Sequence, residues 1–310
     1  MRDEVETLLG RGFRALEEGN LKLAFKMADK LEELGHSACF ELSALAHEEA
    51  GEPKQALRVL ERGTAKAPGV WGLWQLLGNL HSDQDRFDEA LKAYRKGLAL
   101  EGADRSSLSY NLALALYRSG RIAEAREALA LVEGEETLLL RQALLVGLDL
   151  AEGKIQEAEK RARSTILSTL EEEADPVALA ALHVHLGEVL LARSARDEAR
   201  DAGMRALEID PVNHGAFALL REIDESVSDE AKSFELLLQG SLAAAPEVGF
   251  YKSYQVKAMD AEEALRKVMV FENLADPESI QVEESEALAF DLGDRTGVYA
   301  SSGYTFYDRD

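Results

Sequence analysis

Residues 74–100 read WQLLGNLHSDQDRFDEALKAYRKGLAL, a pattern of two helices joined by a turn. Trp74, Leu77 and Gly78 lie on neighbouring turns of the predicted first helix. Ala90 and Tyr94 stand four residues apart in the predicted second helix. The chain is rich in residues that favour helices, and only six prolines interrupt its 310 residues. Such a unit cannot bury its apolar face alone, so further copies are expected at a fixed period.

The same pattern occurs six times along the chain. The alanine of the second helix recurs with spacings of 32, 34, 35, 33 and 41 residues, at Ala24, Ala56, Ala90, Ala125, Ala158 and Ala199. Twelve residues earlier stands a residue that is small in most copies: Gly12, Ala44, Gly78, Ala113, Val146 and Gly187. The turn position, five residues before the alanine, reads Gly19, Gly51, Asp85, Gly120, Gly153 and Ser194.

Each recurring residue has a physical cause. The two helices of a unit cross closely at the alanine and the earlier small residue, so a larger side chain would push them apart. The turn position suits a residue that tolerates positive φ, where glycine avoids the clash of a Cβ. Pro68 and Pro211 follow second helices, and proline ends a helix because it lacks an N–H and clashes with the preceding turn.

These residues resemble the tetratricopeptide repeat, whose signature is W-x2-L-G-x2-Y followed by A-x3-F over about 34 residues. His81 stands where the family usually has Tyr, and Gly102 where it often has Pro. The resemblance covers about residues 5–240 and implies a mainly α, right-handed superhelical solenoid of antiparallel helix pairs. Six repeats and a degenerate seventh are expected. A generic helical bundle is the alternative.

Two places depart from the regular period. The excess in the 41-residue spacing lies around 165–176, where either lengthened helices or a longer solvated connection is expected. Asp175 and Pro176 suit the cap and first turn of the next helix. In the seventh unit, 214–227 is predicted to be a first helix. Ser228 is a candidate cap for a partner helix that continues through Leu238.

The tail has a different composition, with five of the eight tyrosines beyond residue 246. The predicted domains are therefore a repeat solenoid at 1–245 and a small α+β domain at 246–310, with the order β-α-β-β. The evidence is an alternating strand at 250–258, a capping box at Asp260 and Glu263, and a strand around 281–290. The last element is predicted to be a β-hairpin over 297–307, turning at Ser-Ser-Gly. A unit this small is marginal alone, so it should pack on the last helices or on a second chain.

The net charge of −23 argues against nucleic acid and against anionic membranes as partners. No stretch reaches the roughly 18 apolar residues of a spanning helix, and the N-terminus has acids where a signal peptide needs bases. Cys39 is the only cysteine, so an intrachain disulfide cannot form. A cytoplasmic protein is therefore expected.

Catalytic and metal-binding patterns are lacking in the sequence. No Gly-rich phosphate loop, H-E-x-x-H motif or nucleophile elbow occurs. His183 and His185 are two residues apart on a predicted helix and so point to different faces. We expect no enzyme activity, no cofactor and no metal site.

The resemblance implies that the first helices line a concave surface that captures peptides. The family's groove positions, carried onto the front half of this chain, are Glu41, Leu45, Glu48, Glu49, Gln75, Asn79, Asp83, Tyr110, Leu114, Tyr117 and Arg118. In the back half they are Leu140, Ala143, Gly147, Leu150, Val184, Glu188 and Leu191. The paired lysines with which chaperone-binding members hold an acidic carboxylate are missing here. The acidic, Tyr-lined front suits a basic or polar peptide, and the apolar back suits an amphipathic segment.

The predicted function is thus a non-enzymatic scaffold or adaptor that binds a partner protein or peptide in this groove. The alternative is a structural protein that forms homo-oligomers through its C-terminal domain, because that domain is marginal alone and could expose strand edges.

Overall fold

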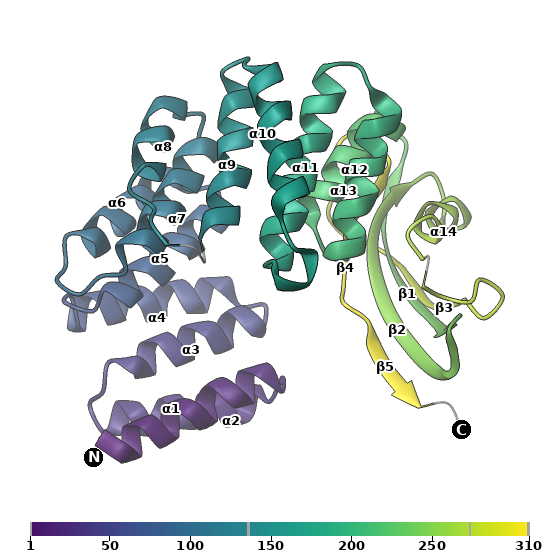
Figure 1. Cartoon of the computed structure of the whole chain (residues 1–310). Coiled ribbons are helices and arrows are strands. Elements are labelled where there is room, and N and C mark those ends of the chain that lie inside the picture. The colour runs from purple at the N-terminus through teal and green to yellow at the C-terminus, as the bar shows by residue number, and fades with distance from the viewer. Residues whose placement is uncertain (1, 135–136, 273, 309–310) are drawn as a thin grey trace. The chain divides into compact units, whose positions relative to one another are not determined.

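The structure is a computed structural model that describes residues 2–134, 137–272 and 274–308 (Figure 1). The chain divides into two compact units, Met1–Arg141 and Gln142–Asp310. Helix pairs form the first unit. Its helices are α1 (Arg2–Glu17), α2 (Leu21–Glu33), α3 (Ala38–Glu49), α4 (Pro53–Lys66), α5 (Trp71–Asp83), α6 (Phe87–Leu98), α7 (Arg105–Arg118) and α8 (Ile122–Leu129). Helix α9 (Leu138–Ala151) runs from the first unit into the second.

The turn inside each repeat has the same backbone form six times. The turn residue has a φ between 56° and 75° at all six predicted positions, Gly19, Gly51, Asp85, Gly120, Gly153 and Ser194. Its N–H bonds to the carbonyl three residues earlier, and the next N–H bonds to the carbonyl five residues earlier. This is the Schellman arrangement, which satisfies the last carbonyls of the first helix. The expected tolerance of positive φ at this position is confirmed.

Replacing Ser194 with glycine should stabilise the second unit. Ser194 has a φ of 62°, a conformation that costs a residue with a Cβ roughly 1–2 kcal/mol, while glycine loses about 0.5–1 kcal/mol more chain entropy on folding. We expect S194G to raise the free energy of unfolding by about 0.5–1 kcal/mol in urea titrations. The reverse control is Gly153→Ala, whose Cβ would meet nothing within 4 Å, so only its backbone strain should act. Equal stabilities for S194G and wild type would contradict the expectation.

Close helix crossing explains the repeated small residues. All six second-helix alanines have 0% of their surface exposed. A Cβ added at Gly12, Gly78 or Gly187 would lie closer than 3.0 Å to a side-chain atom of a neighbouring helix. Both observations confirm that these positions set the distance between helices.

The helices of the second unit are α10 (Ile155–Ser168), the 3₁₀ turn η1 (Glu171–Glu173), α11 (Pro176–Ala192), α12 (Arg196–Ile209) and α13 (His214–Asp224). The long spacing between repeats has two sources. Helix α11 has 17 residues where α3, α5 and α7 have 12 to 14, and η1 occupies the connection before it. The predicted cap is confirmed, because Asp175 Oδ1 accepts a hydrogen bond of 2.7 Å from the Ala178 N–H.

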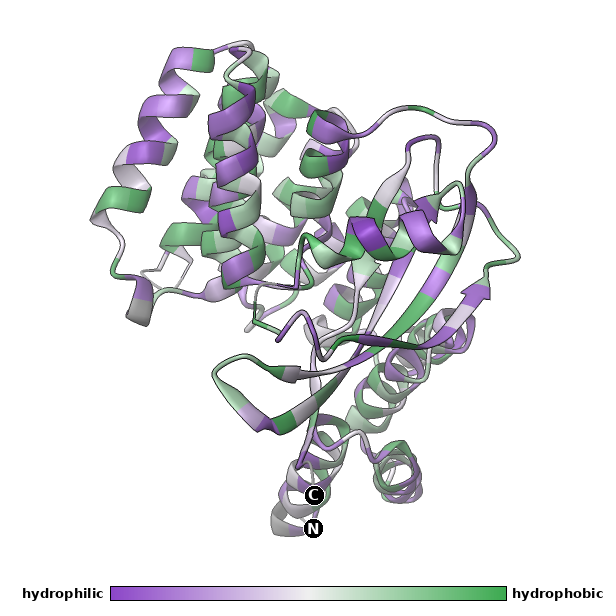
Figure 2. Ribbon diagram, turned by 90° about the vertical axis from the view of Figure 1, so that its right-hand side faces the viewer, coloured by the Kyte–Doolittle hydropathy of each residue, from purple (hydrophilic) through white to green (hydrophobic). Residues whose placement is uncertain are grey.

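The partner helix expected for the seventh unit is not there. The chain forms strand β1 (Lys232–Leu242) instead, and β1 pairs antiparallel with β2 (Ala245–Ala258). Figure 2 shows apolar and polar segments interleaved along these long strands. The expected boundary at residue 245 therefore lies in the hairpin between two paired strands. The change from repeats to sheet comes earlier, between α13 and β1.

The sheet is antiparallel, with the strand order β3-β1-β2-β4 and with β5 also paired to β2. After β2 come α14 (Ala261–Met269), β3 (Gln281–Ala287), β4 (Gly297–Ser301) and β5 (Thr305–Asp308). The predicted strand, capping box and helix of this region are confirmed, since Asp260 Oδ1 accepts from the Glu263 N–H at 2.8 Å. The predicted hairpin of 297–307 is wrong. Strands β4 and β5 pair with different parts of β2, one after the other along its length.

One apolar core joins the sheet to the last helices. It combines Phe217 and Leu220 of α13 with Leu236 of β1, Val256 of β2 and Val268 of α14. The expectation that the tail packs on the last helices is confirmed. The sheet thus covers the apolar face of α13 that a further repeat helix would otherwise cover.

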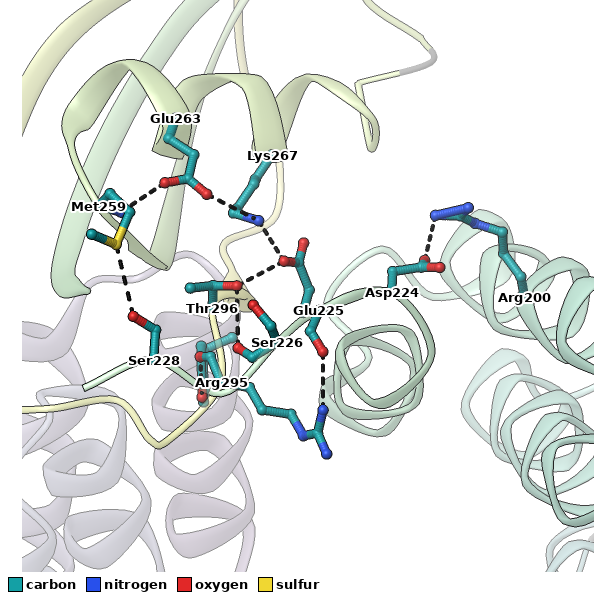
Figure 3. A network of polar contacts seen from close by, with 11 residues as sticks. Arg200, Asp224, Glu225, Ser226, Ser228, Met259, Glu263, Lys267, Arg295 and Thr296 are labelled. Carbon is teal, nitrogen blue, oxygen red and sulfur yellow. Dashed lines mark hydrogen bonds and ion pairs between the residues drawn. The ribbon is translucent and has the colours of Figure 1, made fainter. Parts of the chain in front are cut away.

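A polar network fastens the end of α13 to the sheet (Figure 3). The carboxylate of Glu225 pairs with Lys267 of α14 and accepts a hydrogen bond of 2.8 Å from Thr296 Oγ1. The guanidinium of Arg295 donates to the Glu225 carbonyl at 2.9 Å. Lys267 also lies 3.4 Å from Glu263. One residue after α13 therefore contacts both the segment before β4 and the helix that covers the sheet.

Candidate partner-binding surfaces of the two units

An acidic strip lies on the first helices of the second and third repeats. We define it as Glu41, Glu48 and Glu49 of α3 and Asp83 of α5. Glu41 and Glu48 are seven residues apart and so share a helix face. Glu48 lies close enough to Asp83 for the two charges to interact, which brings the predicted positions of two repeats together.

The strip holds carboxylates in an unfavourable environment. Burial raises the pKa of Glu41, and burial together with the neighbouring Asp83 raises the pKa of Glu48. The pKa of Asp83 is also raised, by burial and by Asp85, against the opposing effect of Arg118. Among the residues that the structure describes, the side chains of Glu41 and Glu48 have neither a hydrogen-bond partner nor a cation partner. Their negative charge is thus partly desolvated and uncompensated.

Beside the strip, predicted residues of α5 and α7 are tied to each other. Asn79 Oδ1 accepts hydrogen bonds from Tyr94 Oη at 2.9 Å and from Asn111 Nδ2 at 3.1 Å. Arg118 donates to Asp85 at 2.9 Å and to Ser82 Oγ at 3.3 Å. These bonds hold neighbouring repeats in register. Asn79 and Arg118 therefore have a structural role in addition to any role in binding.

Three of these partners were missed by sequence reasoning: Ser82, Tyr94 and Asn111. Asn111 follows the predicted position Tyr110, and a polar amide directly before the apolar run of residues 112–116 was the available signal. The remaining predicted residues of the front half are all half-buried, which leaves each of them some surface: Leu45, Gln75, Tyr110, Leu114 and Tyr117.

The predicted apolar surface of the back half is smaller in the structure than expected. Val184 is only 6% exposed and belongs to the core around Phe217, while Ala143 and Gly147 are also buried. Glu188 bonds to His185 Nδ1 at 2.8 Å. The predicted residues that keep a partly exposed apolar side chain are Leu140, Leu150 and Leu191.

Three other titratable groups of the helices, Cys39, His81 and His183, are buried or half-buried. Burial raises the pKa of the Cys39 thiol and lowers the pKa of the His81 and His183 imidazoles, which favours their neutral forms. Within 2–134, 137–272 and 274–308, no three His, Cys, Asp or Glu residues lie together as a metal site would require. In the same ranges, no helix has both the length and the hydropathy needed to span a bilayer.

Stacked helix pairs, with polar side chains linked across successive first helices, define a helical repeat protein. The family model of the tetratricopeptide repeat matches residues 76–135, and the helical part of this chain is a tetratricopeptide repeat solenoid. A comparison with curated proteins finds no matching sequence.

Solved structures share the fold at low sequence identity. The chain is similar to one in the APC/C hetero-tetramer Cut9–Hcn1, with 16% identity, a TM-score of 0.54, and coverage of 67% of this chain and 40% of that one. It is also similar to pilF of Pseudomonas aeruginosa, with 16% identity, a TM-score of 0.52, and coverage of 71% and 98%. The chain thus spans less than half of the Cut9–Hcn1 chain that it matches. Tetratricopeptide repeats generally serve as non-enzymatic scaffolds for protein–protein interaction, and a shared fold does not specify the partner.

Proposed function

We propose that the protein is a scaffold whose acidic strip binds a Lys- or Arg-bearing segment of a partner protein. The observation that carries the proposal is the state of Glu41 and Glu48, which are partly buried, have raised pKa values and lack a cation among the described residues. A partner cation would supply the missing counter-charge. Association would then gain Coulomb energy without breaking an ion pair already present.

The half-buried aromatic rings of Tyr110 and Tyr117, on α7, suit the aliphatic stems and charged heads of the same partner segment. In the second unit, Leu150 and Leu191 suit an amphipathic segment. The lack of a spanning helix among the described residues and the single cysteine agree with a cytoplasmic protein, which we also propose.

The test compares baits that differ only in charge. Wild type, Glu41→Lys/Glu48→Lys and a control, Glu61→Lys/Glu101→Lys, are used for affinity purification. The control makes the same charge change at exposed positions outside the strip. Basic segments of the captured proteins are then synthesised and titrated by calorimetry. We expect at least about tenfold weaker binding to the strip variant, near wild-type binding to the control, and weakening with salt. Equal binding to all three proteins would refute the proposal.

The acidic strip should lower the free energy of unfolding of the unbound protein at neutral pH. Because the pKa of Glu48 is raised by folding, the folded chain binds more protons than the unfolded chain between the ordinary and the raised pKa. Stability therefore falls as pH rises through this window, and the deficit persists above it. We expect Glu48→Gln to raise the free energy of unfolding by less than about 1 kcal/mol at pH 7 and to have no effect below about pH 4.

The measurement is urea denaturation followed by tryptophan fluorescence, since Trp71 and Trp74 both lie in α5 of the first unit. At the lower pH the Glu48 carboxyl is protonated and should be equivalent to the amide of glutamine. A stabilisation of the same size at both pH values would therefore contradict the proposed cause. A gain in stability together with weaker partner binding would identify Glu48 as a residue suited to binding rather than to folding.

Self-assembly through the sheet is the second candidate function, favoured by the exposed edge strand. Strand β3 pairs only with β1 among the described strands, and all its side chains are exposed. It carries Glu283, Glu284 and Glu286, however, and charges on an edge strand oppose pairing with an identical strand. Light scattering distinguishes the candidates. A monomer mass across micromolar concentrations would refute self-assembly, and a dimer that dissociates on adding prolines to β3 would support it.

A further inference from the structure

A pocket of about 410 Å³ lies in the second unit, between α12, α13, α14 and the start of β4. Its floor is apolar: Phe217 and Leu220 of α13 and Val298 of β4 are almost fully buried there. Phe271 packs edge-on against Phe217, with ring centroids 5.4 Å apart. Val270, at the pocket, keeps 57% of its surface exposed. This volume and this lining suit a small apolar group.

The charges around the pocket differ from the rest of the chain. Its lining includes the cations Arg200, Arg221, Arg266 and Lys267 and the anions Asp224, Glu225 and Glu263. Four positive charges against three negative give a balance of +1, in a chain whose net charge is −23. The lining itself is therefore slightly basic in an acidic protein, before the pairing of Arg266 with Glu262 outside the pocket is counted.

Protein groups already engage the three carboxylates of the pocket. Glu225 pairs with Lys267 and accepts from Thr296, and Asp224 pairs with Arg200. Glu263 accepts from the Met259 N–H at 2.8 Å and lies 3.4 Å from Lys267. Figure 3 shows these contacts side by side.

The arginines, in contrast, keep hydrogen-bond donors to spare. A guanidinium has five N–H donors. Among the described residues, Arg200 bonds to Asp224, and Arg266 bonds at 2.8 Å to Glu262 in a pair that is exposed on both sides. Exposed ion pairs of this kind contribute little to stability, so another anion can replace Glu262 at Arg266 at little cost. Unused donors beside an apolar floor favour a ligand that brings an acceptor with negative charge.

A glycine shapes the wall of the pocket. Gly297 has a φ of +116°, and a Cβ there would lie 2.8 Å from Arg221 Cγ and 3.0 Å from Glu225 Cγ. Only a residue without a side chain lets β4 approach α13 this closely. The wall therefore depends on a backbone contact that a side chain would prevent.

We propose that this pocket binds an apolar group that carries a carboxylate, with the apolar body on Phe217, Phe271 and Val270 and the carboxylate at Arg200 and Arg266. The ligand is either a small carboxylic acid or the C-terminal residue of a polypeptide, since both present the same chemistry. This site is separate from the acidic strip and takes a ligand of the opposite charge.

The probes are 3-phenylpropanoate, its uncharged amide and 2-phenylethylammonium, titrated into the full-length protein by ligand-observed NMR and calorimetry. Attraction to the overall charge of −23 alone would favour the cation. The pocket predicts the reverse order, with the carboxylate binding at least about tenfold more tightly than the amide and more tightly than the cation. Amide binding equal to carboxylate binding, or strongest binding of the cation, would overturn the proposal.

Variants locate the binding. Arg266→Gln and Arg200→Gln should each weaken carboxylate binding about tenfold. Arg205→Gln on α12, which removes an arginine that pairs with Glu171 and Glu208 outside the pocket, should leave binding unchanged. Arg266 is exposed, so its variant should fold even if the loss of Arg200 beside Asp224 destabilises the chain. Binding that survives Arg266→Gln intact would refute the assigned place of the carboxylate.

A last comparison separates the two sources of ligand. Peptides that end in Leu-Phe are titrated with a free and with an amidated C-terminus. Preference for the free terminus by about tenfold assigns the pocket to a polypeptide end. Binding of 3-phenylpropanoate without binding of either peptide assigns it to a small acid. Failure of all carboxylate probes would overturn the proposal while leaving the acidic strip untouched.

Discussion

Replacing Lys252 with methionine is expected to lower the free energy of unfolding of the second unit by about 3–5 kcal/mol. Lys252 is 3% exposed in β2, and its Nζ lies 3.4 Å from Oε1 of the fully buried Glu272. Burial lowers the pKa of Lys252, while Glu272 acts to raise it. Removing one partner leaves the other charge buried without compensation, which is the costly case for an ion pair.

The surroundings of Glu272 explain why the effect should be large. Its carboxylate accepts hydrogen bonds from Tyr254 Oη and, at 2.8 Å, from Tyr304 Oη. The Lys252 ammonium lies 4.2 Å from the ring centre of Tyr304 and 4.9 Å from that of Tyr254. Strand β2, the segment between β4 and β5, and the segment after α14 thus meet in one cluster. Burial raises the pKa of both tyrosines, with Glu272 as the next cause.

The control is the double variant Lys252→Met/Glu272→Gln, which removes both charges and keeps a hydrogen-bonding group for the tyrosines. It should recover most of the lost stability. Hydrogen exchange of the β1 and β2 amides measures the second unit, while fluorescence of Trp71 and Trp74 reports on the first unit and should not change. A double variant as unstable as the single one would show that shape, not charge, accounts for the loss.

Replacing Gly78 with alanine should destabilise the first unit by about 1–3 kcal/mol. A Cβ there would lie 2.6 Å from Cδ1 and 2.9 Å from Cζ of Tyr94. Tyr94 is 2% exposed, and its hydroxyl bonds to Asn79, so the ring cannot move without breaking that bond. Overpacking should therefore outweigh the gain in helix propensity.

The matched control lies in the same helix. Gly72 is also in α5, but a Cβ there would meet nothing within 4 Å. Gly72→Ala should stabilise the unit slightly, by up to about 1 kcal/mol, because alanine is the better helix former. Urea titrations of both variants, followed by tryptophan fluorescence, measure the difference. Destabilisation of the same size in both would refute the close-packing argument.

The repeats were predictable because their constraints are local. Six turn residues with positive φ and six buried alanines each follow from sequence positions a fixed distance apart. The tail was predicted less well. In β1, Phe234, Leu237 and Leu238 have the spacing of a helix face. Because the strand is buried on one face and half-buried on the other, both faces carry apolar residues, and the hydropathy of its sequence does not alternate clearly. Pairing with β2, not local preference, makes this segment a strand.

The wrong prediction of a hairpin over 297–307, where the structure has β4 and β5, has a similar origin. Ser302 and Gly303 between two short apolar segments indicate a hairpin. Strand β2 has 14 residues, however, and is long enough to pair with both segments in succession. Only the register of the sheet distinguishes these arrangements.

The family resemblance predicts the residues of the acidic strip, but their chemistry depends on the structure. The resemblance placed Glu48 and Asp83 on a common surface, and the structure adds that the Asp83 charge raises the pKa of Glu48 above what burial alone would give. The pocket between α13, α14 and β4 had no sequence signal, because its residues come from segments about 30 to 80 positions apart.

The sequence by itself determined the helix pairs, their period and their turns, since each depends on residues within about 34 positions of one another. The tertiary structure alone decided where the repeats end. The apolar face of α13 must be covered, and the same chain could cover it with a helix or with a sheet. Long-range strand pairing selected the sheet, and with it the buried Lys252–Glu272 pair and the basic pocket beside α13.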